Sequence, residues 1–257
     1  LKNGKRRIDP TKKFLFRCYD DGTMRCMLSD IYAKIDNVWF LNVLKEVLPG
    51  GMLSHWRGNA DNIYGNVLIP DSIRQEFDSE YGAMISIGNS EIGMRRCFQL
   101  PSLFRAICMN GNIWDQCKGK ANSVVHRGKI NLHDLRKEII TNINDQIPLS
   151  KAMIDKLLNT RTMDTKGYSL KNIFAVLGKS YTLSKAELGA TVNEFLTHES
   201  SNKNLFGIIN SITRAGQQFS NERWYHLDKV GGELTYYSNN DWERVLNRSK
   251  TLTPKEL

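Results

Sequence analysis

The sequence of 257 residues lacks the patterns that mark several common protein classes. No apolar run approaches the roughly 18 residues that a transmembrane helix needs, so we expect no membrane partner. The five cysteines are irregularly spaced without a Cys-x-x-Cys pair, and the five histidines form no His-Glu-x-x-His motif. This argues against a disulfide scaffold or a zinc module and favours reduced thiols in a cytoplasmic protein. The basic leader is followed by no apolar stretch with a cleavage site, which argues against a secretion signal.

Familiar enzyme motifs are missing as well. The sequence has no Gly-x-x-x-x-Gly-Lys-[Ser/Thr] loop for nucleotide phosphates and no Gly-x-Ser-x-Gly nucleophile elbow. Cys108 lies in an apolar register typical of a buried thiol, and His126 lies among cations that disfavour its protonated form. We therefore expect no classical enzyme, no catalytic residue, no metal site and no cofactor.

The acidic residues of the N-terminal half leave one enzymatic alternative open. Asp20-Asp21-Gly22 has the composition of a tight turn, and Asp71 follows a proline in the manner of a helix N-cap. The Glu-x-Lys that a nuclease would add after Asp71 is absent. A metal-dependent nuclease that uses Asp20, Asp21 or Glu91 is therefore the least favoured hypothesis, but it stays open.

The composition is that of a folded, basic protein. Hydrophobic residues make up 40% of the chain, which suffices for a core, and the formal net charge is +9. The charge is segregated: residues 1–13 carry +5, residues 14–91 carry −5, residues 92–129 carry +6 and residues 130–257 carry +3. Segregation of this kind indicates a polyanionic partner that binds at residues 92–129 and at the leader.

Short apolar stretches separated by turn residues predict a β-rich first half. The expected elements are a hairpin over 14–28, a helix capped by Asp36 and ended by Pro49, strands over 52–58 and 63–70, a short helix over 71–80, a hairpin over 82–101, a short helix from Pro101 and Ser102 to Asn110-Gly111, and a strand over 112–117.

Apolar residues at helical spacing predict a helical second half. The expected helices lie over 131–147, 150–160, 169–181, 184–198 and 204–219. Ser184 and Glu187 have the spacing of a capping box. The fold class is therefore α+β, with a β-hairpin-rich N-terminal half and a mainly helical C-terminal half. We expect a basic leader over 1–13, a mixed core over 14–130, and a helical region over 131–257 that packs on the same core as one domain.

The main cluster of functional candidates lies in the basic segment. Lys118, Lys120, His126, Arg127 and Lys129 fall within twelve residues that contain no acid, and such cations neutralise phosphates. Nearby aromatic residues would stack on the bases of a single strand. The expected nucleic-acid-binding residues are Arg95, Arg96, Arg105, Lys118, Lys120, Arg127 and Lys129, together with Trp56 and Arg57, and the further stacking candidates are Phe98 and Trp114.

Simpler explanations exist for individual residues. A stretch rich in Lys and Gly is often a solvated loop, and Trp56 or Trp114 can belong to the core. Arg105 on an otherwise apolar helix requires an acid or a phosphate, and Glu91 is a candidate for its internal partner. A structural Glu91–Arg105 ion pair therefore stands beside the nucleic-acid hypothesis.

Several stretches occur in a characteristic order along the chain: NSEIG (Asn89–Gly93), LFRAICMNG (Leu103–Gly111), HRGKI from His126, NLFGIINSITRAGQ (Asn204–Gln217) and RWYHLDKVGGEL (Arg223–Leu234). Together they resemble a family of phage and plasmid proteins catalogued as domain of unknown function number nine-three-two. The resemblance covers roughly Phe40 to Leu234 and implies a mobile-element origin and a setting in the cytoplasm of a bacterial host.

The order of elements is more distantly similar to the core of single-strand-annealing recombinases of the Red-beta type. That resemblance implies a strand held in a basic groove of a homo-oligomeric ring, without ATP or metal. The leading hypothesis is therefore a phage or mobile-element protein that binds and anneals single-stranded DNA in recombination or replication. The alternative is a phage structural or protein-interaction component whose basic face docks an acidic partner.

Overall fold

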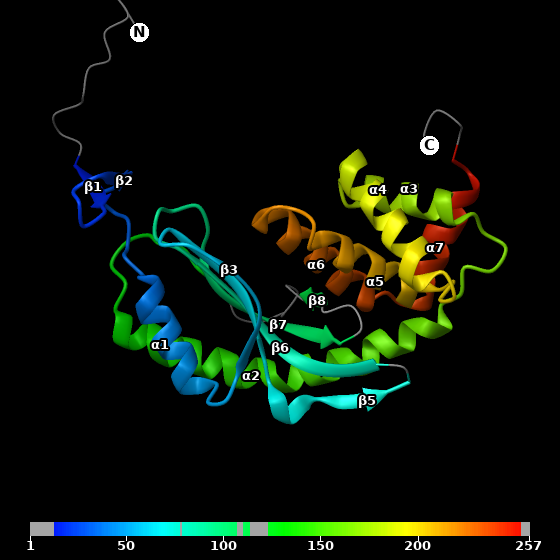
Figure 1. Cartoon of the computed structure of the whole chain (residues 1–257), viewed down its shortest axis with the longest axis horizontal. Coiled ribbons are helices and arrows are strands. Elements are labelled where there is room, and N and C mark those ends of the chain that lie inside the picture. The colour runs from blue at the N-terminus through cyan, green and yellow to red at the C-terminus, as the bar shows by residue number, and fades with distance from the viewer. Residues whose placement is uncertain (1–12, 78, 107–109, 114–122, 253–257) are drawn as a thin grey trace, which may run out of the picture.

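The computed structural model describes residues 13–77, 79–106, 110–113 and 123–252. Its fold is α+β, with an antiparallel sheet in the N-terminal half and helices in the C-terminal half, so the predicted fold class is confirmed. A separate two-stranded hairpin stands at one end of the sheet, and the C-terminal helices gather at the other end (Figure 1).

Nine strands are found among the described residues. The first two form the hairpin predicted over 14–28, and the others form one sheet in the order β3-β4-β6-β7-β8, with β5 beside β6 and β9 beside β7. The strands are β1 (Phe14–Cys18), β2 (Met24–Ser29), β3 (Met52–Gly58), β4 (Asn62–Leu68), β5 (Arg74–Glu76), β6 (Ser79–Ser90), β7 (Cys97–Arg105), β8 (Asn110–Ile113) and β9 (Ser123–Val124).

Seven α-helices are found in the same part of the chain, and none of them is long and apolar enough to cross a membrane. They are α1 (Asn37–Val47), α2 (Leu132–Asn159), α3 (Leu170–Ser180), α4 (Lys185–Glu194), α5 (Leu205–Gly216), α6 (Asn221–Thr235) and α7 (Asn239–Lys250). The predicted capping box of Ser184 and Glu187 begins α4. A π-helical turn (Phe195–Glu199) follows α4.

Helices cover both faces of the sheet. On one face, Ile85 and Ile87 of β6 belong to a core with residues of α1 and α2 such as Phe40 and Ile139. Successive side chains of a strand point to opposite faces of the sheet, so every second residue faces the other way. On that second face, Tyr64 of β4 and Phe98 of β7 pack against Trp224 of α6. The sheet is therefore a middle layer between α1 and α2 on one side and the start of α6 on the other.

The C-terminal helices form a second core that extends to the sheet. Its fully buried members include Phe206, Ile209 and Leu227, and Tyr81 of β6 and Leu103 of β7 reach into it. The two halves of the chain therefore share apolar contacts at the end of the sheet that lies away from the hairpin.

The short helix predicted over 71–80 is wrong. Only Pro70–Ser72 is helical, as a single 3-10 turn, and the chain continues as β5 and β6. β5 has only three residues, which is too short a run to show the alternation by which strands are recognised in a sequence. The hairpin predicted over 82–101 is confirmed, because β6 and β7 pair antiparallel from Tyr81 and Arg105 to Gly88 and Phe98.

The helix predicted from Pro101 is also wrong, because β7 continues to Arg105 and β8 lies where that helix was expected to end. Pro101 is tolerated because of its place in the ladder. Among the described residues, the pairing with β9 ends at Phe98 and the pairing with β8 begins at Ser102, so Pro101 has no paired residue on that edge.

The two helices predicted on either side of Pro148 are one helix, α2. Asn131 caps its start by accepting a hydrogen bond from the His133 N–H. Beyond the proline, the buried Ser150 hydroxyl lies 3.0 Å from the carbonyl oxygen of Met84 on β6. Packing on the sheet thus supports the helix where the proline removes a backbone bond.

Candidate nucleic-acid interface

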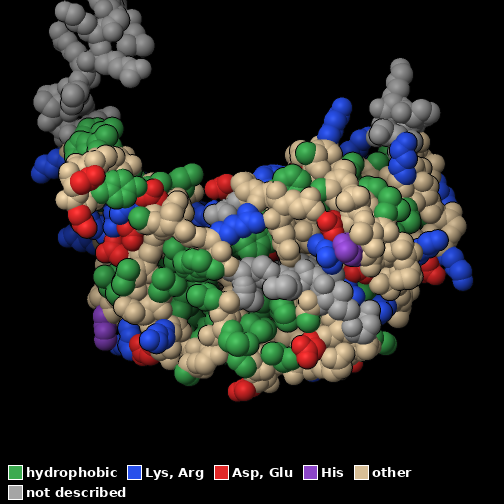
Figure 2. Space-filling model, in the orientation of Figure 1, with side chains coloured by type: hydrophobic (Ala, Val, Ile, Leu, Met, Phe, Trp, Pro, Cys, Tyr) green, Lys and Arg blue, Asp and Glu red, His purple; other side chains and the backbone are tan. Residues whose placement is uncertain are grey.

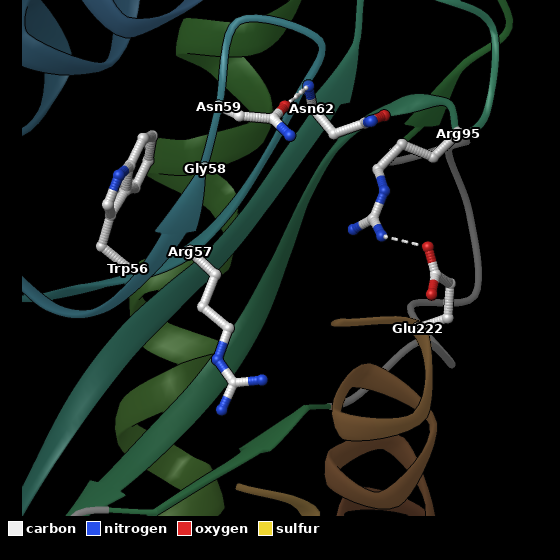
Figure 3. Close-up of a pocket in the computed structure, with 7 residues that line it drawn as sticks. All are labelled: Trp56, Arg57, Gly58, Asn59, Asn62, Arg95 and Glu222. Atoms are coloured by element: carbon white, nitrogen blue, oxygen red, sulfur yellow. Dashed lines mark hydrogen bonds and ion pairs between the residues drawn. The ribbon is translucent and has the colours of Figure 1, made fainter. Parts of the chain in front are cut away.

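Trp56 and Arg57 point to opposite faces of the edge strand β3. Trp56 pairs with Gly65 and Arg57 pairs with Tyr64, which faces α6. The indole of Trp56 is 41% exposed and is turned away from Arg57 and Arg95 (Figure 3). The two neighbours were predicted to share one nucleic-acid surface, and the alternation of the strand separates them.

Arg57 is occupied by the fold. Its guanidinium donates to the backbone carbonyls of Phe219 at 2.5 Å and Gln217 at 2.6 Å, just before α6. It also lies 4.8 Å from the centre of the Trp224 ring. Arg57 therefore connects the end of the α5–α6 loop to the sheet, and its charge adds to the positive potential around the cleft.

Arg95 lies opposite Arg57, in the turn between β6 and β7. Its side chain is 13% exposed, its guanidinium lies 5.8 Å from the Tyr64 ring, and its Nη2 lies 3.5 Å from Oε1 of Glu222. Glu222 stands in the first turn of α6 and is 64% exposed. The pair therefore joins the end of the sheet to the helical half by a contact that solvent reaches and weakens.

A polar cleft opens between these groups, with a volume of about 460 Å³. Asn59 in the β3–β4 turn and Asn62 at the start of β4 bound it on one side, and Arg95 and Glu222 bound it on the other (Figure 3). The buried amide oxygen of Asn62 has no hydrogen-bond partner in the described part of the chain. The residues that line the cleft are Trp56, Arg57, Gly58, Asn59, Asn62, Arg95 and Glu222.

Arg105, a predicted nucleic-acid contact, is buried and ion-paired inside the fold. It lies on β7 and not on a helix, its side chain is 3% exposed, and its Nη1 lies 2.5 Å from Oε1 of Glu199. The predicted internal partner, Glu91, lies at the opposite end of the sheet, beside the β6–β7 turn. The expectation of a structural ion pair is confirmed for Arg105, but the partner is Glu199.

Three of the predicted cations are exposed at the hairpin end of the sheet: Arg96, Arg127 and Lys129. Arg96 immediately precedes β7, and β9 pairs with the first residues of β7. The chain that leaves β9 toward Arg127 and Lys129 therefore starts beside Arg96. Together with Arg95, these residues bring four positive charges from two segments to one end of the sheet. Lys118, Lys120 and Trp114 lie outside the described residues.

His126 holds the segment that carries two of these cations. It is buried, its ring stacks on Tyr32 with 5.0 Å between ring centres, and its Nδ1 lies 3.1 Å from the Ala33 carbonyl. Burial lowers the pKa of His126, and the Arg17 charge lowers it further, against the bond to Ala33. The imidazole is therefore neutral at pH 7 and fixes Arg127 beside the base of the hairpin.

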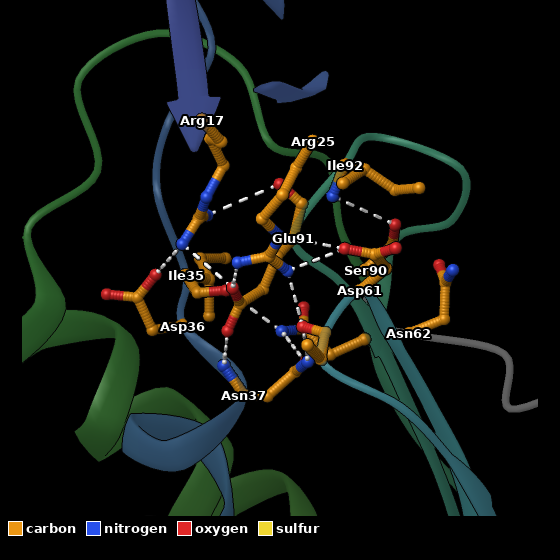
Figure 4. A network of polar contacts seen from close by, with 12 residues as sticks. Arg17, Arg25, Ile35, Asp36, Asn37, Asp61, Asn62, Ser90, Glu91 and Ile92 are labelled. Atoms are coloured by element: carbon orange, nitrogen blue, oxygen red, sulfur yellow. Dashed lines mark hydrogen bonds and ion pairs between the residues drawn. The ribbon is translucent and has the colours of Figure 1, made fainter. Parts of the chain in front are cut away.

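Glu91 is the centre of a polar network that the sequence did not reveal (Figure 4). Its Oε2 accepts hydrogen bonds from Arg17 at 2.9 Å and Arg25 at 3.1 Å, both from the hairpin. Its Oε1 accepts the Asn37 N–H at 2.8 Å. A carboxylate from the β6–β7 turn thus fixes the hairpin and satisfies an amide in the first turn of α1.

Two further acids of the same segment are neutralised there. Asp36 occupies the N-cap position of α1 as predicted, but its side chain forms no cap bond and instead pairs with Arg17 at 2.5 Å. Asp61 pairs with Arg25 at 2.7 Å. Because Arg17 and Arg25 belong to residues 14–91 as well, these pairs leave the net charge of −5 over that segment unchanged.

The described residues contain no group of three His, Cys, Asp or Glu side chains placed to hold a metal ion. Asp20 and Asp21 lie in the β1–β2 turn, where Gly22 adopts a φ of +82°. Glu91 is engaged with two guanidinium groups. The described geometry therefore gives the nuclease hypothesis no support.

Beneath the cleft, a carboxyl group is buried between the sheet and α6. Asp228 has no exposed surface, and its Oδ2 lies 3.3 Å from the Tyr64 hydroxyl. Burial raises the pKa of Asp228 well above its ordinary value, against the hydrogen bond from Tyr64, so the folded protein favours the neutral acid. Phe98, a predicted stacking residue, belongs to the same buried layer and is not available to a base.

Comparisons with protein-family models, with curated proteins and with solved structures found no match to this chain.

Proposed function

We propose that this protein binds single-stranded nucleic acid, in the first place DNA, without ATP, in recombination or replication of a phage or another mobile element. The observation that carries the proposal is the gathering of Arg95, Arg96, Arg127 and Lys129 at the hairpin end of the sheet, where Arg95 also lines the cleft. The annealing of two strands follows only from the resemblance to recombinases and is the finer part of the proposal.

The dimensions of the site favour a flexible strand. A volume of about 460 Å³ is typical of small-ligand sites, so the cleft admits a nucleotide of a bent single strand but not a rigid duplex. Arg95 faces this volume and supplies a planar donor for a phosphate. Arg96, Arg127 and Lys129 would neutralise the phosphates that follow, and each neutralised phosphate releases counterions.

Fluorescence anisotropy of a labelled oligothymidine, titrated at several salt concentrations, tests the proposal. We expect affinity to fall steeply as salt rises. Replacing Arg96, Arg127 and Lys129 together by Gln should lower the magnitude of the log–log salt slope by about 2, since each single-strand phosphate contact contributes about 0.7.

The matched control replaces Lys166, Lys171 and Lys185, which are exposed in the helical half, by Gln. It removes the same net charge from residues outside the proposed site. The salt slope of this control should therefore stay close to that of the wild type. If the two triple variants bind alike, the site assignment fails. If the wild type binds no oligonucleotide at low salt, the function itself fails, and a protein that retains an acidic protein partner after nuclease treatment would support the alternative of a protein-docking component.

A further inference from the structure

The hairpin β1–β2 presents an uncovered apolar face. Phe16 of β1 and Met27 of β2 lie directly opposite each other and are 54% and 55% exposed. Phe14 and Met24, at the two ends of the same face, are 42% and 58% exposed. An isolated two-stranded ribbon is only marginally stable, and a soluble monomer rarely exposes a contiguous apolar group of this kind.

The other face of the hairpin is fixed to the protein. Leu15 and Leu28 are half-buried, and Arg17 and Arg25 reach from this face to Glu91 (Figure 4). The network therefore holds the hairpin in one orientation, with its apolar face turned outward. In the described part of the chain, both outer edges of the hairpin are without a paired strand.

A second exposed edge belongs to the main sheet. Strand β3 pairs only with β4 among the described strands. Its residues Met52, Leu53 and Trp56 are 50%, 55% and 41% exposed. Hydrophobic side chains gather on the hairpin and again over the region of this edge (Figure 2). Natural proteins usually cover or charge such an edge, because its free N–H and C=O groups pair with another chain.

We propose that the β1–β2 hairpin of one molecule docks on the β3 edge of a second copy of the same chain. β1 has five residues and β3 has seven, so one can pair along most of the other. Docking covers two apolar surfaces and satisfies two free backbone edges at once. A single molecule carries both halves of this contact, which identifies a second copy as the occupant.

Charge supports one direction of pairing. Asp20 and Asp21 are exposed at the tip of the hairpin, and Lys45 is exposed in the last turn of α1, shortly before β3 begins. If β1 runs antiparallel to β3, the tip lies beside the start of β3 and the opposite charges meet. The contact joins different surfaces of the two copies, so it repeats from copy to copy into a ring or a filament.

Sedimentation velocity of the nuclease-treated protein over a range of concentrations tests this proposal. We expect the wild type to associate, and Phe16→Glu and Leu53→Glu each to raise the dissociation constant by about tenfold or more, because each would bury a charge in the contact. Met27→Lys gives a second change on the hairpin. Both hairpin side chains are exposed, so circular dichroism and thermal melting should show folded variants.

A mixture of the Phe16→Glu and Leu53→Glu proteins distinguishes the proposed geometry. The first retains an intact β3 edge and the second an intact hairpin, so the mixture should form dimers and nothing larger. Leu196→Glu, at a side chain that is 63% exposed in the helical half, is the control and should associate like the wild type.

A wild type that stays monomeric at every concentration overturns the proposal. The proposal is also overturned if Phe16→Glu or Leu53→Glu leaves association unchanged, or if Leu196→Glu weakens association as much as they do. It is overturned as well if the mixture of the Phe16→Glu and Leu53→Glu proteins forms no dimers. No nucleic acid is present in these measurements, so their outcome is independent of the proposed function.

Discussion

Arg105 on β7 and Glu199 in the π-helical turn form an ion pair in which both side chains are almost fully buried, 3% and 2% exposed. They lie 94 residues apart in the sequence. The Arg105 guanidinium also lies 4.9 Å from the Phe206 ring, and the second oxygen of Glu199 accepts a hydrogen bond from Asn202 at 2.7 Å. This pair connects the sheet with the helical half at the end opposite the proposed interface.

Removing the charge of Glu199 should strongly destabilise the protein. Glu199→Gln removes the carboxylate charge that pairs with the buried Arg105 guanidinium, which costs about 3 kcal/mol in the free energy of unfolding. Urea denaturation at pH 7 measures the loss. The double variant with Arg105→Met and Glu199→Leu should lose less free energy of unfolding than the two single variants lose in sum. The reason is that both charges of the pair are then removed together.

The exposed pair of Arg136 and Glu46 provides the control for this experiment. Its side chains are 38% and 49% exposed, so Glu46→Gln should cost less than about 1 kcal/mol. Equal losses from Glu46→Gln and Glu199→Gln would contradict the role of burial.

Glu222 should weaken nucleic-acid binding, because its carboxylate competes with a phosphate for Arg95. Glu222→Gln should therefore raise the affinity for oligothymidine by about two- to fivefold, the range expected for an exposed ion pair. Glu243→Gln removes the same charge from an exposed position on α7 and should have a smaller effect. Anisotropy titrations at low salt compare the three proteins. Equal gains from the two changes would show a general effect of net charge and no specific contact at the cleft.

Asp228→Asn should stabilise the protein near neutral pH. Because the folded state raises the pKa of Asp228, the folded protein binds a proton that the unfolded chain releases above about pH 4. Stability from this group is complete below that pH and is lost as the pH rises toward the folded-state pKa. The neutral amide avoids this loss, so the thermal midpoint of the variant should exceed that of the wild type at pH 7 to 8, with the gain absent at pH 3.

Tyr64→Phe serves as the control for Asp228→Asn. It removes the hydroxyl that bonds to Asp228 but leaves the buried carboxyl in place. The pH dependence of stability should therefore persist in Tyr64→Phe. An Asp228→Asn protein that melts lower than the wild type at pH 8 would contradict a neutral Asp228.

Glu187 should make the protein lose stability in acid. Burial alone would raise its pKa, but hydrogen bonds from Arg223, at 2.5 and 2.7 Å, and from Ser184 outweigh burial and lower the pKa to about 2. The stability from this group is present above the unfolded-state pKa and is lost as the pH falls from about 4.5 toward 2. The loss is on the order of 2 kcal/mol.

Urea denaturation between pH 5 and pH 2 measures this effect. Glu187→Gln should have a flatter pH dependence than the wild type over that range. Asp241→Asn changes the capping box of α7, where the acid is 42% exposed, and should alter the pH dependence less. A Glu187→Gln protein with the wild-type slope would exclude Glu187 as the source.

The sequence by itself determined the features that depend on near neighbours. The turn of Asp20-Asp21-Gly22, the cap at Ser184 and the amphipathic helices of the C-terminal half follow from local hydrogen bonding and periodicity. These signals were sufficient to predict the α+β class. They predicted the β6–β7 hairpin, but they failed at β5, which is too short to show a period, and at the end of β7, where burial on both faces removes the period of a strand.

Only the tertiary structure decided which charges remain available. Arg57, Arg95 and Arg105 look alike in the sequence, but packing gives them carbonyl oxygens, an exposed acid and a buried acid as partners. Those partners come from elements 94 to 162 residues away. The energy of an ion pair depends on distance and burial, and neither is encoded by composition or spacing, so a charge count locates a basic segment but not its free cations.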